Sequence, residues 1–221
     1  MGYETETSQG SVPDVDDDKF SSSMTQFGFK KGLGCPHAIY TVRKVIDYFC
    51  TNNSTVNICT IDISKAFDRI NYNKLFCKLM DRDTPIDFIC VLKNWYSKSS
   101  VCVKWEDQFS EFVRLNSGVK QGGVLSPYLF AVYIDSLLLK LRKSGLGCHI
   151  KSFCLNSCAY ADDLVLMSIS LDQLQKLVNL CNDELTNCNL TISTAKSACI
   201  RIGPRFKITP CDIVMNDVKI G

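Results

Sequence analysis

The sequence predicts an α+β domain, because segments with helical spacing of apolar residues alternate with short strand-like runs. The chain has 221 residues, of which 46% are hydrophobic and 22% charged, so it is long enough for one good-sized core or for a core with a satellite subdomain. Residues 1–24 differ, since they combine serines and acids with few large apolar residues. We therefore expect a disordered leader over 1–24 and one folded domain over 25–221.

Composition excludes several classes of protein. No run approaches the ~20 consecutive apolar residues of a membrane span, and the N-terminus is acidic, unlike a signal peptide. The sequence thus favours an intracellular protein, nuclear or cytoplasmic, that is not secreted and has no membrane partner. A net charge of +2 argues against purely electrostatic nucleic-acid binding. Local clusters of lysine and arginine are nevertheless compatible with a basic groove along which phosphates could bind.

Thirteen cysteines are present, most of them inside apolar runs, with two histidines. The close two-residue spacing of zinc knuckles is missing from the sequence, so buried reduced thiols are favoured over a metal or disulfide framework.

The first half of the chain predicts three helices and a buried strand. Pro36 suits the first helical position, and apolar residues follow at helical spacing as far as Phe49. Val56–Ile63 is typical of a buried strand that carries Asp62 at its end. Asn71 begins a short helix, and Thr84 and Pro85 open another that runs through Trp95.

The middle of the chain predicts a hairpin, a loop and a long helix. Val101–Trp105 and Phe109–Leu115 are β-rich runs that a polar turn separates. Ser117–Gly123 is a glycine-bearing loop. Ser126 as N-cap and Pro127 at the first position then begin a helix through Leu141.

The last third predicts a second hairpin around an acidic turn, Cys158–Met167, which holds Asp162 and Asp163. Ser170 and Gln173 form a capping-box pattern for the helix that follows. A strand and a terminal hairpin complete the pattern, at Ala198–Ile202 and Ile213–Ile220.

The acidic turn suggests a metal site. A stable sheet gains nothing from adjacent carboxylates, whereas Mg²⁺ binds one or two protein carboxylates together with phosphate oxygens. If the strand that ends in Asp62 neighbours the hairpin, Asp62 lies beside Asp162 and Asp163, and three carboxylates suit two-metal phosphoryl transfer. The alternative is a polar turn and an unrelated acid at a strand end.

Five blocks of sequence resemble the reverse transcriptase domain of non-LTR (LINE-type, jockey-like) retrotransposons. They are Q-F-G-F-K-K-G from Gln26, I-D-I-S-K-A-F-D from Ile61, S-G-V-K-Q-G-G-V-L-S-P from Ser117, Y-A-D-D from Tyr160, and the segment around Lys196. The resemblance covers about Gln26 to the C-terminus. Y-A-D-D alone is weak, but the second, third and fourth blocks in this order are highly specific.

The resemblance implies a catalytic site. Asp62, Asp162 and Asp163 are expected to be catalytic and to hold two Mg²⁺ ions, with Mn²⁺ as an alternative ion, and the Ile63 carbonyl adds an oxygen. Phe67 matches the aromatic residue that stacks under the incoming sugar and excludes a 2'-hydroxyl; the alternative is an ordinary core phenylalanine.

Other residues are expected to bind substrate. The resemblance implies that Gln121 and Gly122 line the nucleotide and template pocket, with Gly123 less certain. It places Tyr160 near the primer terminus and Lys196 near the triphosphate, where a lysine assists the leaving pyrophosphate. Further candidates for phosphate contact are Lys65, Arg69 and Lys120.

The implied fold is a polymerase palm, an antiparallel sheet backed by helices, with partial fingers and without a thumb. The family normally carries finger strands before Gln26 and a thumb after the palm, so we expect a domain truncated at both ends.

The main hypothesis is an RNA-directed DNA polymerase domain that joins dNTPs to the 3'-hydroxyl of a DNA primer on an RNA template. The alternative is a catalytically inactive retrotransposon remnant that binds RNA nonspecifically at most. A related polymerase, such as a group II intron maturase or an RNA-templated RNA polymerase, fits less well, because the second and third blocks resemble the LINE-type pattern more closely.

Overall fold

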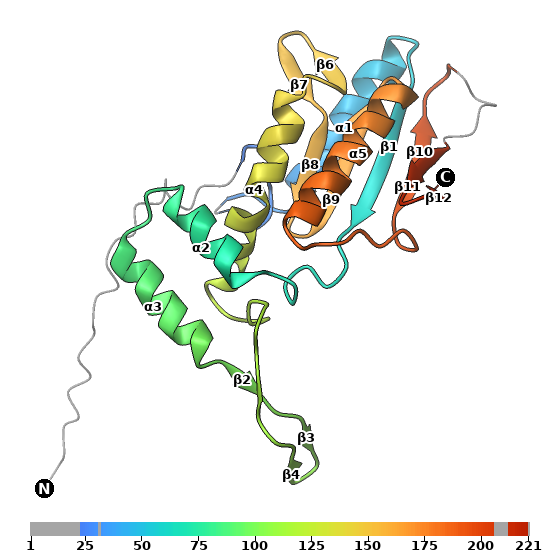
Figure 1. The fold of residues 1–221 in the computed structure, drawn as a ribbon. Helices are drawn as coiled ribbons and strands as arrows, with labels where there is room; N and C mark the ends of the chain where they lie inside the picture. The colour runs from blue at the N-terminus through green and yellow to red at the C-terminus, as the bar shows by residue number, and fades with distance from the viewer. Residues whose placement is uncertain (1–22, 31, 206–211, 221) are drawn as a thin grey trace, which may run out of the picture.

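A four-stranded antiparallel sheet forms the centre of the computed structural model, which describes residues 23–30, 32–205 and 212–220 (Figure 1). The order of its strands is β10-β1-β9-β8. Their bounds are β1 Val56–Asp62, β8 Ser157–Tyr160, β9 Asp163–Ser168 and β10 Ala198–Ile202. Residues 1–22 of the predicted leader lie outside the described chain, so its disorder stays a prediction. Strands from distant parts of the sequence therefore meet in this sheet.

Helices cover both faces of the sheet. On one face, α4 (Ser126–Lys143) and α5 (Leu171–Asn187) enclose the larger core, which includes Ile61 and Leu164. On the other face, α1 (Cys35–Thr51) packs over Ile58 and Val165. Figure 1 shows α4 and α5 in front of the sheet and α1 behind it. Alternate residues of each strand thus enter two different cores.

Two further helices extend the larger core. They are α2 (Tyr72–Met80) and α3 (Ile86–Ser97), and α2 packs against both α3 and α4. α2 begins at the predicted place, and Asn71 is its N-cap, since the Asn71 side chain accepts a hydrogen bond from the Lys74 amide. Leu75, Leu79 and Leu92 are buried, so these helices belong to the same domain as the sheet.

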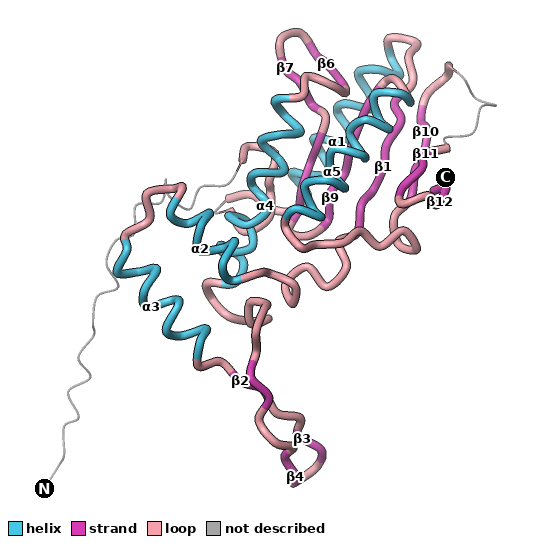
Figure 2. Tube along the Cα trace, viewed as in Figure 1, coloured by secondary structure: helices cyan, strands magenta, loops and turns pink. Residues whose placement is uncertain are grey.

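Small antiparallel ladders complete the chain (Figure 2). Residues 99–115 form a projecting arm in which β2 (Ser100–Val101) pairs with β5 (Val113–Arg114), and β3 (Lys104–Trp105) with β4 (Gln108–Phe109). This is the predicted first hairpin, with shorter strands. The other ladders are β6 (Cys148–Ile150) with β7 (Phe153–Leu155), and β11 (Ile213–Met215) with β12 (Val218–Ile220).

One predicted helix cap is at the wrong residue, and another lacks its predicted hydrogen bonds. Ser126 is the first residue of α4 rather than its N-cap, and its hydroxyl donates to the Lys120 carbonyl at 2.5 Å. Ser170 is the N-cap of α5 as predicted, but its side chain makes no cap hydrogen bond, and Gln173 accepts a hydrogen bond from the Gly147 amide instead of completing the capping box. In both cases a partner outside the helix binds the side chain that the pattern assigns to a cap.

Some apolar residues are less buried than the sequence predicts. Ile39 of α1 and Ile86 of α3 are exposed, as are Cys77 and Cys90. The described cysteines are free thiols, of which half are buried. In the described part of the chain, the helices are too short or too polar to span a membrane.

Candidate active site

Three carboxylates meet at one end of the central sheet. The register of β1 and β9 sets Asp62 directly opposite Asp163. Tyr160 pairs with Asp163 across the hairpin, so Ala161 and Asp162 form its two-residue loop. Residues directly opposite in antiparallel strands have Cβ atoms about 4.5–5.5 Å apart. The structure thus brings together the two acidic segments that the sequence singles out.

This placement of carboxylates does not favour the sheet itself. Like charges directly opposite on neighbouring strands are destabilising. Burial raises the pKa of Asp163, and the nearby charges of Asp162 and Asp62 raise it further. A bound cation would remove this repulsion, which is the behaviour expected of a metal site.

The chemistry of the three side chains suits a divalent cation with oxygen ligands. Within the described residues, the three carboxylates form no ion pair. In that part of the chain, no group of three or more His, Cys, Asp or Glu side chains is arranged to hold a metal ion by itself. Mg²⁺ usually takes only one or two protein carboxylates and completes its shell with substrate phosphates and water. An open site of this kind fits the observed arrangement.

A tight turn supports the backbone of Asp62. The Asp62 amide donates to Ser197 Oγ at 3.2 Å, and the Asp62 carbonyl accepts from the Ser193 amide at 2.9 Å. Lys196 lies in this turn with an exposed side chain, so it is close in sequence to the residue that contacts Asp62. Ile63 forms an isolated antiparallel bridge with Ile192. The strand end and the segment around Lys196 are therefore one structural unit.

Phe67 is partly buried in an aromatic stack. Its ring lies 4.7 Å from that of Phe130, nearly parallel at 19°, and 6.5 Å from that of Phe29, edge-on at 88°. The Phe67 carbonyl accepts from the Val119 amide at 2.8 Å. The stack fixes the plane of the Phe67 ring.

The glycine-bearing loop packs against the turn after β1. Gly118 has a φ of 91°, and an added Cβ would lie 2.7 Å from the Asp68 carbonyl oxygen, so a larger residue does not fit. Gln121 and Gly122 are exposed farther along the loop, and an added Cβ at Gly122 would meet nothing within 4 Å. These two residues have room for a ligand, while Gly123 is half-buried beside Ser126.

Tyr160 and Asp163 also line a groove of about 360 Å³ between α1 and the β8–β9 hairpin. The rest of its lining is mainly apolar and includes Ile39, Val42 and Ile46. Of the three carboxylates, Asp163 therefore borders this mainly apolar groove, together with Tyr160.

The three phosphate-contact candidates have different surroundings. Lys65 and Lys120 are exposed. Arg69 is bound to the Thr191 hydroxyl. The lysines are free to meet a phosphate as they stand, whereas Arg69 would have to exchange its partner.

Gln26 is a site residue that the sequence reasoning missed. Its side chain is fully buried and contacts the backbone of Ala161, inside the acidic turn. The sequence analysis identified the block from Gln26 to Gly32 as part of the family resemblance, but it assigned no role to Gln26.

The order of these elements along the chain and in the sheet can be compared with known proteins. Residues 18–211 match the family model for reverse transcriptase (RNA-dependent DNA polymerase). The chain belongs to the reverse transcriptase family. Reverse transcriptases generally use divalent metal ions, in agreement with the carboxylates at the sheet end.

Its relatives are polymerases of non-LTR retrotransposons, which confirms the resemblance. The Pol polyprotein of the type-2 element R2DM of Drosophila melanogaster is 30% identical over 83% of this chain and 18% of its own length. The probable RNA-directed DNA polymerase of transposon BS, also from Drosophila melanogaster, is 25% identical over 84% and 20%. The chain thus spans about a fifth of these relatives.

The fold is that of a reverse transcriptase palm. A structure of apo telomerase from Candida tropicalis, truncated from its C-terminal domain, matches with a TM-score of 0.64 and 17% identity. The match covers 84% of this chain and 37% of the telomerase chain. This likeness confirms the predicted α+β polymerase palm.

Proposed function

We propose that this chain is an RNA-directed DNA polymerase domain that joins dNTPs to the 3'-hydroxyl of a DNA primer on an RNA template. The observation that carries the proposal is the register that sets Asp62 opposite Asp163, with Asp162 in the adjoining loop. Membership of the reverse transcriptase family supports the same reaction.

In this proposal, Asp62 and Asp162 hold two Mg²⁺ ions, Asp163 completes the site, and the Ile63 carbonyl adds an oxygen. When bound, such ions lower the pKa of the attacking hydroxyl and stabilise the leaving oxygen. The mutual repulsion of the carboxylates would be relieved by the bound cations. Mn²⁺ has the same preference for oxygen ligands and could substitute.

The surrounding residues bind the substrates. Phe67, held by its aromatic stack, would lie under the incoming sugar and exclude a 2'-hydroxyl. Exposed Gln121 and Gly122 would line the nucleotide and template pocket, and Tyr160 would contact the primer terminus. Lys196, in the turn that supports Asp62, would place a positive charge near the leaving pyrophosphate.

A primer-extension assay tests the proposal. The purified chain is given an RNA template with an annealed DNA primer, dNTPs and Mg²⁺, and incorporation is compared with that of Asp162→Ala. We expect Mg²⁺-dependent extension that Asp162→Ala abolishes. Equal extension by both proteins would refute the site. Retention of RNA that falls steeply with salt, without extension by either protein, would favour the inactive remnant.

A further inference from the structure

A short segment before α1 lies along the edge of the acidic hairpin. We name residues 23–28 the edge strap. The Ala159 amide of β8 donates to the Thr25 carbonyl at 2.8 Å, and the Phe27 amide donates to the Ala159 carbonyl at 2.8 Å. Gln26 and Ala159 form a parallel bridge. The strap therefore occupies the outer edge of the hairpin, as an additional strand would.

The side chain of Gln26 reaches from the strap into the acidic loop. Its Nε2 donates to the Ala161 carbonyl at 3.2 Å, and its Oε1 accepts from the Ala161 amide at 3.1 Å. The same Oε1 accepts from the Gly28 amide at 2.9 Å. Because Gln26 has no exposed surface, water does not replace these bonds. Both backbone polar groups of Ala161 are thus held by one amide.

Ala161 needs such support because of its backbone conformation. It is the first residue of the two-residue loop and has a φ of 57°, in the left-handed region. Two-residue hairpin loops favour glycine where φ is positive, since a side chain there is strained. The next residue is Asp162. Hydrogen bonds that hold Ala161 therefore fix the direction in which the following two carboxylates leave the loop.

Close packing between the strap and the loop gives independent evidence. A Cβ added at Gly28 would lie 2.4 Å from the Ala161 amide nitrogen and 3.2 Å from the Ala161 Cα. Because these are backbone atoms, they could not move aside for a side chain at position 28. The strap thus approaches the acidic loop as closely as a glycine allows.

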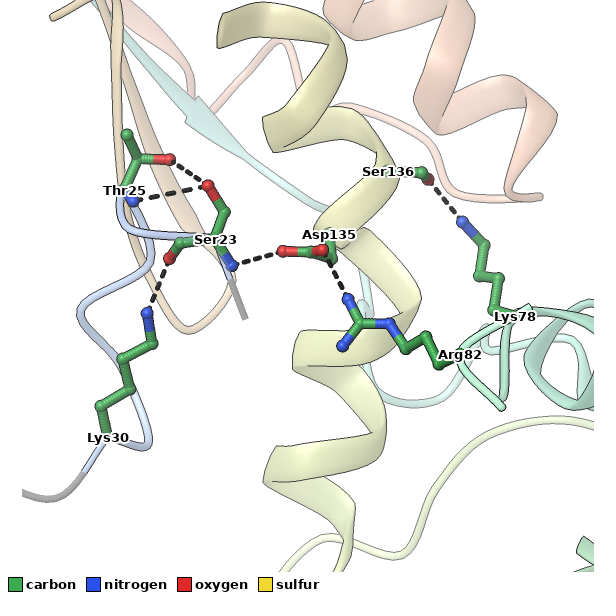
Figure 3. Close-up of polar contacts among 7 residues, drawn as sticks. All are labelled: Ser23, Thr25, Lys30, Lys78, Arg82, Asp135 and Ser136. Atoms are coloured by element: carbon green, nitrogen blue, oxygen red, sulfur yellow. Dashed lines mark hydrogen bonds and ion pairs between the residues drawn. The ribbon is translucent and has the colours of Figure 1, made fainter. Parts of the chain in front are cut away.

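The other end of the strap is held by a buried charge (Figure 3). The Ser23 amide donates to Asp135 Oδ1 at 2.5 Å, and Arg82 donates to Asp135 Oδ2 at 2.5 Å. Lys30 Nζ donates to the Ser23 carbonyl at 2.7 Å. Burial lowers the pKa of Lys30, and the charge of Asp135 opposes that shift. Since Asp135 belongs to α4, the core fixes the strap at Ser23 while Gln26 fixes the loop.

We propose that Gln26 is a positioning residue for the polymerase site: it holds the backbone of Ala161 and thereby sets the place of the Asp162 and Asp163 carboxylates. The inference rests on the proposed function. Gln26 itself touches neither the reacting atoms nor a metal ion. Residues that orient metal ligands typically change metal affinity or activity by about 10–100-fold when they are replaced.

The test compares Gln26→Met with a matched control in the same strap. Methionine is close to glutamine in length but lacks all three hydrogen bonds. Thr25→Val removes a hydroxyl whose hydrogen-bond partner among the described residues is the Ser23 side chain, at 3.1 Å, and leaves the bonds to β8 and Ala161 in place. We expect Gln26→Met to raise the Mg²⁺ concentration for half-maximal primer extension by about 10-fold or more. Thr25→Val should match the wild type.

Amide hydrogen exchange followed by NMR gives a readout that needs neither metal nor activity. In Gln26→Met the Ala161 amide should exchange roughly 5-fold faster, as expected for the loss of one hydrogen bond. The Ala159 amide, bonded to the Thr25 carbonyl, should remain protected. A general loss of stability would accelerate both amides equally.

A second variant keeps the inference testable if Gln26→Met does not fold. Gln26→Glu retains an oxygen for the Gly28 and Ala161 amides but, when ionised, lacks the donor to the Ala161 carbonyl. It should keep the Ala161 amide protected and still raise the Mg²⁺ requirement. Wild-type behaviour of the variants in both readouts would overturn the inference. No extension by the wild type would refute the proposed function instead, and the exchange data would still report on the contact.

Discussion

The carboxylate end of the central sheet and the projecting arm of residues 99–115 contain similar residue types in opposite environments. Ile61 and Leu164, beside the carboxylates, are each 2% exposed. Trp105 and Phe112 of the arm are 78% and 73% exposed. In the sheet, α4 and α5 cover the strands, whereas the arm projects away from both helices (Figure 1). Whether an apolar strand residue is buried therefore depends on the presence of a covering helix and not on the type of residue.

The two regions also differ in how firmly their backbones are held. β1 has seven residues and is paired on both sides, by β9 and β10. Each ladder of the arm pairs two residues with two others. A site that must fix carboxylates relative to one another needs strands that are paired on both sides, as β1 is. The comparison therefore predicts that equivalent substitutions have large effects at the sheet end and small effects in the arm.

The largest difference is expected for the loss of a single carboxylate. Asp62→Asn should reduce primer extension by roughly 1,000-fold, because metal stabilisation of the transition state is worth several kcal/mol. Asp107→Asn, in the turn of the arm, is the matched control and should extend primers as the wild type does. Extension rates at saturating Mg²⁺ measure both. Comparable rates for the two variants would remove the functional distinction between the regions.

A large stability difference is expected for apolar residues. Leu166 of β9 is fully buried, so Leu166→Ala should lower the free energy of unfolding by about 2–5 kcal/mol. Phe112→Ala should change it by less than about 0.5 kcal/mol, since this ring is mostly exposed. Urea denaturation measures both values. A cost at Phe112 equal to that at Leu166 would show that the arm shares the core of the sheet.

The parts of the fold that the sequence predicted are those with strong local patterns. A buried run that ends in Asp62 and a hairpin with an acidic turn were both recognisable, whereas their adjacency was only the condition under which the three carboxylates would share a cation. Asn71 was recognisable as a helix cap because its partner, the Lys74 amide, is three residues away. Each of these features depends on neighbours in the sequence.

The parts that were missed depend on partners outside the local helix and strand patterns. The Ser126 hydroxyl prefers the Lys120 carbonyl to a cap, and Gln173 prefers the Gly147 amide. Gln26 lies 135 residues from Ala161, so no local pattern connects them. Ile39 belongs to a regular apolar face of α1, yet it lies at the edge of the groove beside the hairpin and stays exposed. Such choices are made by tertiary packing, which periodicity does not encode.

An intermediate effect is expected for ion pairs. Arg82→Met leaves the buried Asp135 carboxylate without its cation and should lower the free energy of unfolding by about 3 kcal/mol. Lys219→Met breaks the exposed pair with Asp212 and should cost less than about 1 kcal/mol. Thermal unfolding at low and high salt separates them, because only the exposed pair is strongly screened. Equal costs would show that the Asp135 network does not anchor the body of the domain.

The smallest effect concerns the repulsion among the site carboxylates. The raised pKa of Asp163 means that wild-type stability falls as the pH rises from about 3.8 through the folded-state pKa. In EDTA at pH 7, Asp163→Asn should therefore unfold at a slightly higher temperature than the wild type, by an amount worth less than about 1 kcal/mol. Added Mg²⁺ should stabilise the wild type more than the variant, since the ion binds only the folded carboxylate site.

Asp107→Asn of the arm is again the control for this last comparison and, because its site carboxylates are intact, Mg²⁺ should stabilise it as much as the wild type. If Asp163→Asn were less stable than the wild type in EDTA, the carboxylate would be contributing to the sheet rather than opposing it. Its position opposite Asp62 would then have a structural explanation, and the case for a cation at this end of the sheet would be weaker. If Asp163→Asn is more stable than the wild type without metal and is stabilised less by Mg²⁺, then Asp163 serves ion binding at a cost to stability, as functional residues often do.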